Sequence, residues 1–182
     1  MTLAILLATV TAGTACSSSK GEDSEGKAAT TRIHLSRAVE YTELTGLAAN
    51  SSAVVKVTAG TATGGEINGV PTTVTEVRVT QLVSGEIPGD TLSVQQFGNG
   101  ETIVENSAPI LKQGNEYLLF VRPFHFEESD ETGLHSITGG RGEYVYDKER
   151  DTYRLQGGED ARIPPTLSSS EIAKISRLPL AT

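Results

Sequence analysis

The sequence predicts a mainly β fold, and three observations lead to that prediction. Residues 73–83 (TVTEVRVTQLV) alternate apolar and polar side chains with a period of two, which is typical of a strand with one buried face. Residues 117–121 (YLLFV) form an unbroken apolar run bounded by turn residues, which indicates a strand buried on both faces. Glycine and proline interrupt the chain around these segments, as turns require.

The first elements are a short helix and a strand. Residues 37–51 place apolar side chains near helical spacing, and Gly46 or Asn50 would end that helix. Residues 53–59 (AVVKVTA) are rich in β-branched side chains and partly alternating, which predicts a strand. Residues 60–71 are rich in glycine and threonine, so we expect a loop or the end of a hairpin there.

The strand over residues 73–83 is expected to have a buried face and a wet face. The buried face carries Thr75, Val77, Val79 and Val83. The wet face carries Glu76, Arg78 and Thr80. Residues 85–90 supply a tight turn, because proline presets φ and glycine accepts a positive φ. A further strand is expected over residues 91–97, with Leu92 and Val94 facing the core.

The C-terminal third predicts a turn, a hairpin and a final helix. Residues 111–116 form a turn into the buried run. Residues 143–146 and 152–155 predict a hairpin, and two consecutive prolines then break the chain. Serines 168–170 and Glu171 offer N-cap groups for a short helix whose apolar side is Ile172, Ile175 and Leu178.

Composition excludes several classes of function. The 182 residues include 15 Lys and Arg against 23 Asp and Glu, a formal charge of −8, with four Phe, five Tyr and no Trp. A nucleic-acid-binding protein needs basic grooves and stacking aromatics, so we expect no nucleic-acid partner. The single cysteine excludes an intramolecular disulfide framework and sites built from several thiolates. No cofactor motif is present, and we expect no cofactor.

The N-terminal region predicts a targeting signal. Residues 3–12 (LAILLATVTA) are shorter than the ~20 apolar residues that span a bilayer but suit the core of a secretory signal. Small residues and then Cys16 follow, and a polar serine run begins at residue 17. This pattern resembles a bacterial lipoprotein signal, in which a peptidase cuts before a diacylglycerylated cysteine. The alternative is a buried core helix whose cysteine only packs.

The resemblance divides the chain into three parts and predicts where in the cell the protein is located. Residues 1–15 would be the signal peptide, and residues 16–31 the lipidated Cys16 with a polar tether. The tether lacks large apolar side chains and is expected to be a flexible spacer. Residues 32–182 would form one domain. The expected location is extracytoplasmic, with the protein held to the cell membrane by acyl chains on Cys16.

The predicted domain resembles the netrin and tissue-metalloproteinase-inhibitor family. The match covers about residues 39–146 and is carried by residues 77–85, by Gly89-Asp90-Thr91 and by Leu111-Lys112-x-Gly114-x-x-Tyr117-Leu118-Leu119-Phe120. The resemblance implies an OB-like, five-stranded closed or partly open barrel, with a short helix before it and a short C-terminal helix. Metalloproteinase inhibition is not carried over, because it needs a free N-terminal cysteine on the barrel.

One acidic segment is a weak candidate for a metal site. Carboxylates lie between two histidines, and the candidate ligands are His125, Glu127, Glu128, Asp130 and His135. Oxygen ligands suit Ca²⁺ and imidazoles suit Zn²⁺, but the spacing matches neither the EF-hand nor a zinc-protease helix. The plain alternative is a solvated loop between two strands, as charge runs usually are.

These observations favour a non-catalytic binding domain. No G-x-S-x-G or phosphate-binding motif is present, so no catalytic residue is assigned. Candidate contacts to an extracytoplasmic protein or a glycan are Arg78, Arg122, Phe124 and Phe126. Two alternatives remain open: a metal-assisted hydrolase that uses the loop from His125 to His135, and a structural envelope protein.

Overall fold

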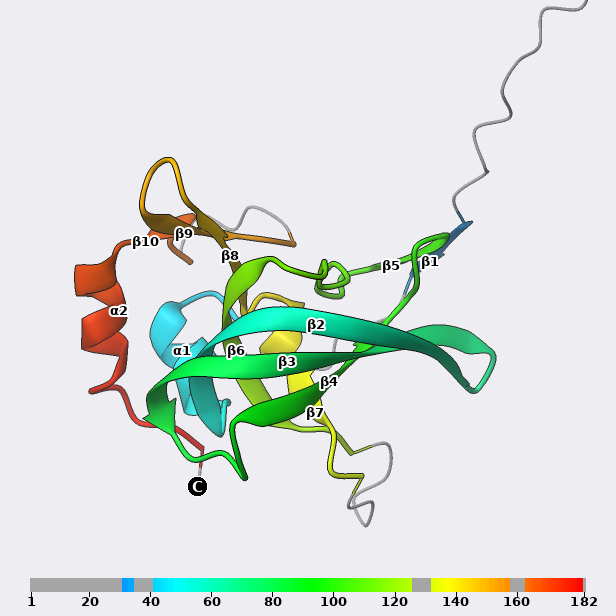
Figure 1. Ribbon diagram of the computed structural model, residues 1–182, viewed down its shortest axis with the longest axis horizontal. Coiled ribbons are helices and arrows are strands. Elements are labelled where there is room, and N and C mark those ends of the chain that lie inside the picture. The colour runs from blue at the N-terminus through cyan, green and yellow to red at the C-terminus, as the bar shows by residue number, and fades with distance from the viewer. Residues whose placement is uncertain (1–30, 35–40, 126–131, 158–162, 182) are drawn as a thin grey trace, which may run out of the picture.

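The computed structural model describes residues 31–34, 41–125, 132–157 and 163–181, and shows a mainly β fold (Figure 1). Its strands are β1 (Thr31–His34), β2 (Ala53–Ile67), β3 (Val70–Gly85), β4 (Thr91–Phe97), β5 (Thr102–Glu105), β6 (Glu116–Pro123), β7 (His135–Ile137), β8 (Glu143–Asp147), β9 (Thr152–Leu155) and β10 (Thr166–Leu167). The helical segments are α1 (Leu44–Ala49), the 3₁₀ turn η1 (Thr138–Gly140) and α2 (Ser169–Ile175).

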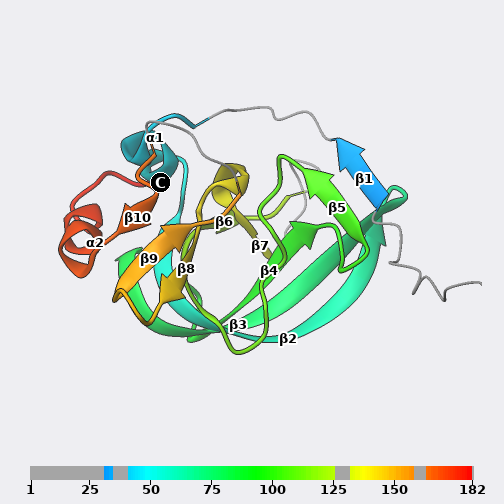
Figure 2. The same cartoon turned by 90° about the horizontal axis from the view of Figure 1, so that it is seen from above.

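Five of the described strands close into a ring. Within one sheet the order is β10-β9-β8-β6-β2-β3-β4-β7, and an added pairing of β6 with β7 closes the cycle β6-β2-β3-β4-β7. The long strands β2 and β3 curve around one side of this ring (Figure 2). Only β4 and β7 pair in parallel within it, and β1 and β5 form a separate two-stranded parallel sheet.

The apolar side chains form two clusters on opposite faces of β2 and β6. The inner cluster contains Val55, Val57, Val77, Val94, Leu119 and Val121. The outer cluster contains Leu47 of α1, Val54, Phe120, Tyr144, Leu167, Ile172 and Ile175. Because β6 lies between them, residues 117–121 are all buried, as the unbroken apolar run predicted. Among the residues that the structure describes, the members of both clusters lie at Tyr41 or later in the chain.

Residues 60–71 form the end of a hairpin, which is one of the two structures predicted for them, and the alternative of a loop is wrong for most of the segment. Strand β2 continues to Ile67, and the turn is only Asn68-Gly69, both with positive φ. This is the pair preferred in a two-residue hairpin turn. Gly64 and Gly65 are tolerated because the hairpin pairs them with Thr73 and Thr72. The long hairpin therefore projects beyond the ring (Figure 1).

Val83 lies on the opposite face from the predicted one. Val57 pairs with Val79 and Lys56 with Gln81, so Thr80 is an extra residue in β3. Such a bulge moves the side chains that follow it to the other face of the sheet, and a second register shift leaves Val83 itself unpaired between Leu82 and Ser84. Val83 consequently packs on the outer cluster, whereas Val77 and Val79 pack on the inner one as predicted.

Both predicted short helices are present. In α2 the Ser168 Oγ accepts a hydrogen bond from the Glu171 amide, and the Glu171 carboxylate accepts one from the Ser168 amide. This capping box begins the helix at the expected place, with Ile172 and Ile175 buried. The predicted hairpin of residues 143–146 and 152–155 corresponds to β8 and β9, which pair antiparallel.

Candidate functional site

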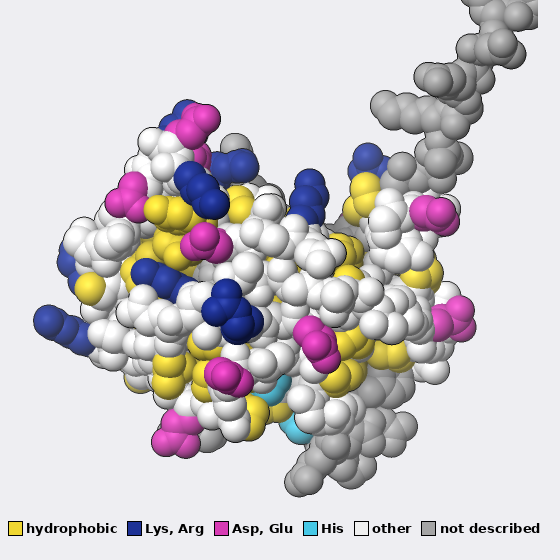
Figure 3. Space-filling view, viewed as in Figure 1, with side chains coloured by type: hydrophobic (Ala, Val, Ile, Leu, Met, Phe, Trp, Pro, Cys, Tyr) yellow, Lys and Arg dark blue, Asp and Glu magenta, His cyan; other side chains and the backbone are white. Residues whose placement is uncertain are grey.

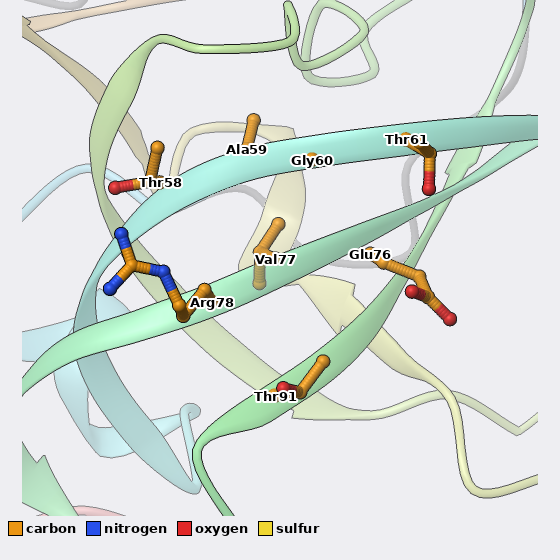
Figure 4. A pocket seen from close by; sticks show the side chains of 8 residues that line it. All are labelled: Thr58, Ala59, Gly60, Thr61, Glu76, Val77, Arg78 and Thr91. Atoms are coloured by element: carbon orange, nitrogen blue, oxygen red, sulfur yellow. The ribbon is translucent and has the colours of Figure 1, made fainter.

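The described surface has a concavity of about 310 Å³ on the outer side of β2 and β3 (Figure 4). It is lined by Thr58, Ala59, Gly60, Thr61, Glu76, Val77, Arg78 and Thr91. A bulge produces it, because Gly60 and Thr61 together lie opposite Glu76. A Cβ at position 60 would be 2.9 Å from the Glu76 carbonyl oxygen, so glycine lets the two strands approach here.

The concavity presents one charge of each sign among hydroxyl groups. The Arg78 side chain extends toward Thr58, while the Glu76 carboxylate points away from Arg78 (Figure 4). Both side chains are exposed, as the alternation in the sequence predicted, and neither forms an ion pair with the residues that the structure describes. These groups suit hydrogen bonding to a polar ligand.

Beside the concavity, aromatic rings support a lysine. The Lys56 ammonium lies 5.5 Å from the centroid of the Tyr153 ring, within the range of a cation–π contact. The Tyr146 and Tyr153 rings are 5.1 Å apart, and the Tyr146 hydroxyl donates to Asp151 at 2.7 Å. Burial raises the pKa of Tyr153 to about 12, so its hydroxyl remains protonated. Basic and acidic side chains are interspersed over this face (Figure 3).

The two histidines of the acidic segment are placed differently from each other. His135 begins β7 and lies two residues before the core residue Ile137, so its side chain is on the inner face. Its Nδ1 atom is buried without a hydrogen-bond partner among the described residues. Burial lowers the pKa of His135, which keeps the imidazole neutral at pH 7. His125 is exposed, two residues beyond the Pro123 that pairs with His135.

The remaining candidate metal ligands, Glu127, Glu128 and Asp130, lie outside the described residues, as does Phe126. Within the described ranges, no three His, Cys, Asp or Glu side chains are grouped so that they would hold a metal ion. Arg122 is exposed. Phe124 is buried and meets Phe97 edge-on, with ring centroids 6.4 Å apart, so it is a packing residue and not a surface contact.

No pattern in the sequence pointed to Glu143, which is the most deeply buried carboxyl group among the described residues. Its side chain is 1% exposed, and it lies opposite Leu119, whose side chain belongs to the inner cluster. Opposed residues of antiparallel strands share a face, so the carboxyl group points into the ring. Its Oε2 atom has no hydrogen-bond partner among the described residues. Burial raises the pKa of Glu143 to about 8.

Cys16, the signal segment of residues 1–15 and residues 17–30 of the tether lie outside the described residues. None of the helices in the described ranges is long and apolar enough to cross a membrane. Comparisons of the chain with protein-family models, with curated proteins and with solved structures found no match.

Proposed function

We propose that the protein is an extracytoplasmic lipoprotein, anchored through Cys16, whose OB-like domain binds a protein or a glycan without catalysing a reaction. The observation that carries the proposal is the position of the lone thiol. Cys16 lies where an apolar run ends and a polar, serine-rich run begins. Acylation needs a cysteine at such a junction, whereas packing in a core does not.

The fold is compatible with a tether that enters from one end of the molecule. Among the described residues, the members of both apolar clusters lie at Tyr41 or later, so β1 belongs to neither cluster. Strand β1 has mostly exposed side chains and lies at the end of the fold opposite α2 in both views (Figures 1 and 2). A spacer that precedes β1 therefore joins the domain at its surface.

The concavity on β2 and β3 supports binding as the activity of the domain. Threonine hydroxyls, a guanidinium and a carboxylate are groups that recognise a polar partner, and the partly exposed Tyr146 adds an aromatic ring held in place by Tyr153. The residues that line the concavity include neither histidine nor cysteine.

The anchor is tested by expressing the chain in a bacterial host with an alkyne-labelled fatty acid. We expect the label on the protein and the protein in the membrane fraction. The Cys16→Ser variant is expected to lose both, and Ser17→Cys in the same variant should restore neither. An unlabelled protein recovered without membrane would refute the anchor.

The binding face is tested by crosslinking in cells and capture of the protein from native membranes. We expect a crosslinked partner whose recovery falls when Arg78 and Glu76 are both replaced by alanine. Arg177→Ala is the matched control, because Arg177 is also exposed but lies beyond α2. Equal recovery with both variants would place the binding surface elsewhere.

A further inference from the structure

Strand β1 occupies the edge of β5 through a small set of interactions. The two strands pair in parallel over four residues, from Thr31 with Thr102 to His34 with Glu105. The Thr31 amide also donates to the Glu101 carbonyl at 3.1 Å. Among the described strands, β5 has no other sheet partner. A short, isolated, parallel pair is a weak form of β structure.

The side chains of β1 add charge complementarity and little burial. Arg32 Nη1 lies 3.7 Å from one oxygen of Glu105, and His34 Nδ1 lies 3.2 Å from the other. All three side chains are at least 43% exposed, so these ion pairs specify the register more than they stabilise it. A strand that docks on β5 is thus selected by an arginine and a histidine at alternate positions, both of which contact Glu105.

Strand β5 is itself well supported by the domain. Val104 and Thr102 are buried, and the Asn99 side chain accepts hydrogen bonds from the amides of Glu101 and Thr102. The side chain of Ile103 is 47% exposed, one of two large apolar side chains at the described surface with such exposure. The acceptor edge therefore persists when β1 leaves it, and it then exposes unpaired backbone groups.

We propose that the edge of β5 is a strand-acceptor site and that its occupant in trans is β1 of a second copy of this chain. The second copy offers the same backbone groups and the same Arg32 and His34 side chains, so every interaction made within one chain is available between two. Reciprocal exchange gives a closed, two-fold dimer. This inference does not depend on the lipid anchor, because it concerns residues 31–34 and 102–105 alone.

The exchange is tested with single cysteines at positions 32 and 103, which pair in register and are both exposed. Full chains that carry Cys16→Ser in mild detergent are used. One copy carries Arg32→Cys and the other Ile103→Cys, with different tags, and the mixture is oxidised. A disulfide needs Cα atoms within about 7 Å, so it reports direct pairing. Leu82→Cys is the matched control, because Leu82 is 44% exposed on β3.

We expect the tagged heterodimer to form roughly tenfold more with Ile103→Cys than with Leu82→Cys, since only the former holds the two cysteines in register, and to increase with protein concentration. A single chain with both Arg32→Cys and Ile103→Cys is expected to form the internal disulfide. If the internal disulfide forms but the heterodimer yield equals that of the control, exchange is refuted. If the internal disulfide does not form either, the pairing of β1 with β5, and the proposal with it, is refuted.

Discussion

Replacing Glu143 by glutamine is expected to remove a large part of the pH dependence of folding. The side chain is 1% exposed, and its carboxyl group lies among the apolar residues of the inner cluster. Burial disfavours the charged form and raises the pKa of Glu143 from its ordinary value of 4.5 to about 8. Glutamine has nearly the same shape and does not ionise.

The direction of the effect follows from the order of the two pKa values. Below about pH 4.5, the folded and unfolded chains both hold the proton, so no stability is lost. Between about pH 4.5 and 8 the unfolded chain releases the proton and the folded chain retains it, so the free energy of unfolding falls as the pH rises. Above that range the loss is complete and constant.

The size of the loss is obtained from the same interval. Each pKa unit corresponds to about 1.4 kcal/mol, so the full penalty is roughly 5 kcal/mol above pH 8 and about 3 kcal/mol at pH 7. A domain of this kind has a total stability of about 5–15 kcal/mol, so the effect is easily measured.

The assay is urea unfolding of the wild type and Glu143→Gln at pH 5, 7 and 9. The stability advantage of the variant is expected to be below about 1 kcal/mol at pH 5 and roughly 5 kcal/mol at pH 9. Taking the difference between the two proteins cancels other titrating groups, including His135. Glu101→Gln, at an exposed glutamate, should show no such divergence. Parallel pH profiles for the wild type and Glu143→Gln would refute the reasoning.

Gly60→Ala is expected to destabilise the fold by roughly 1–3 kcal/mol, because the added Cβ would lie 2.9 Å from the Glu76 carbonyl oxygen; unchanged urea unfolding would show that β2 shifts freely there. Ser168→Ala removes the capping box of α2 and should cost about 1 kcal/mol, seen as a lower Tm. Glu105→Gln removes the carboxylate that Arg32 and His34 of β1 contact and should speed amide exchange of residues 31–34 without changing global unfolding. Equal exchange would mean that these contacts do not hold β1.

The sequence predicted those elements in which each face has a single kind of surroundings, either an apolar cluster or solvent. The run of residues 117–121 is buried because both clusters contact it, and the alternation of Thr75, Val77 and Val79 matches a strand with one face on the inner cluster. The helix α2 was predictable because its capping box is local in the chain. Each of these patterns is read within a single segment.

The features that escaped prediction depend on long-range pairing. Residues 60–67 extend β2 only because β3 provides partners, and the face of Val83 depends on two register shifts, one at Thr80 and one at Val83 itself. Strand β5 is too short to show a pattern, and it pairs with β1 from 71 residues earlier in the chain. Glu143 begins a strand covered on both faces, so alternation does not reveal that its carboxyl group is buried.

The candidate site was predictable only in part, for the same reason. The exposure of Arg78 and Glu76 follows from alternation along one strand, but the concavity needs the bulge at Gly60 and the neighbouring strand β4. The contact of Lys56 with Tyr153 joins residues almost a hundred positions apart. Phe124 was expected at the surface, but it packs on Phe97 because β4 brings that ring to it.

The most direct test of the proposed lipoprotein is intact-mass spectrometry of the protein purified from membranes of a bacterial host. We expect a chain that begins at Cys16 and carries the added mass of a diacylglyceryl group, with or without a further acyl chain on the amine. A protein of unprocessed N-terminus with an unmodified thiol at Cys16 would contradict the anchor.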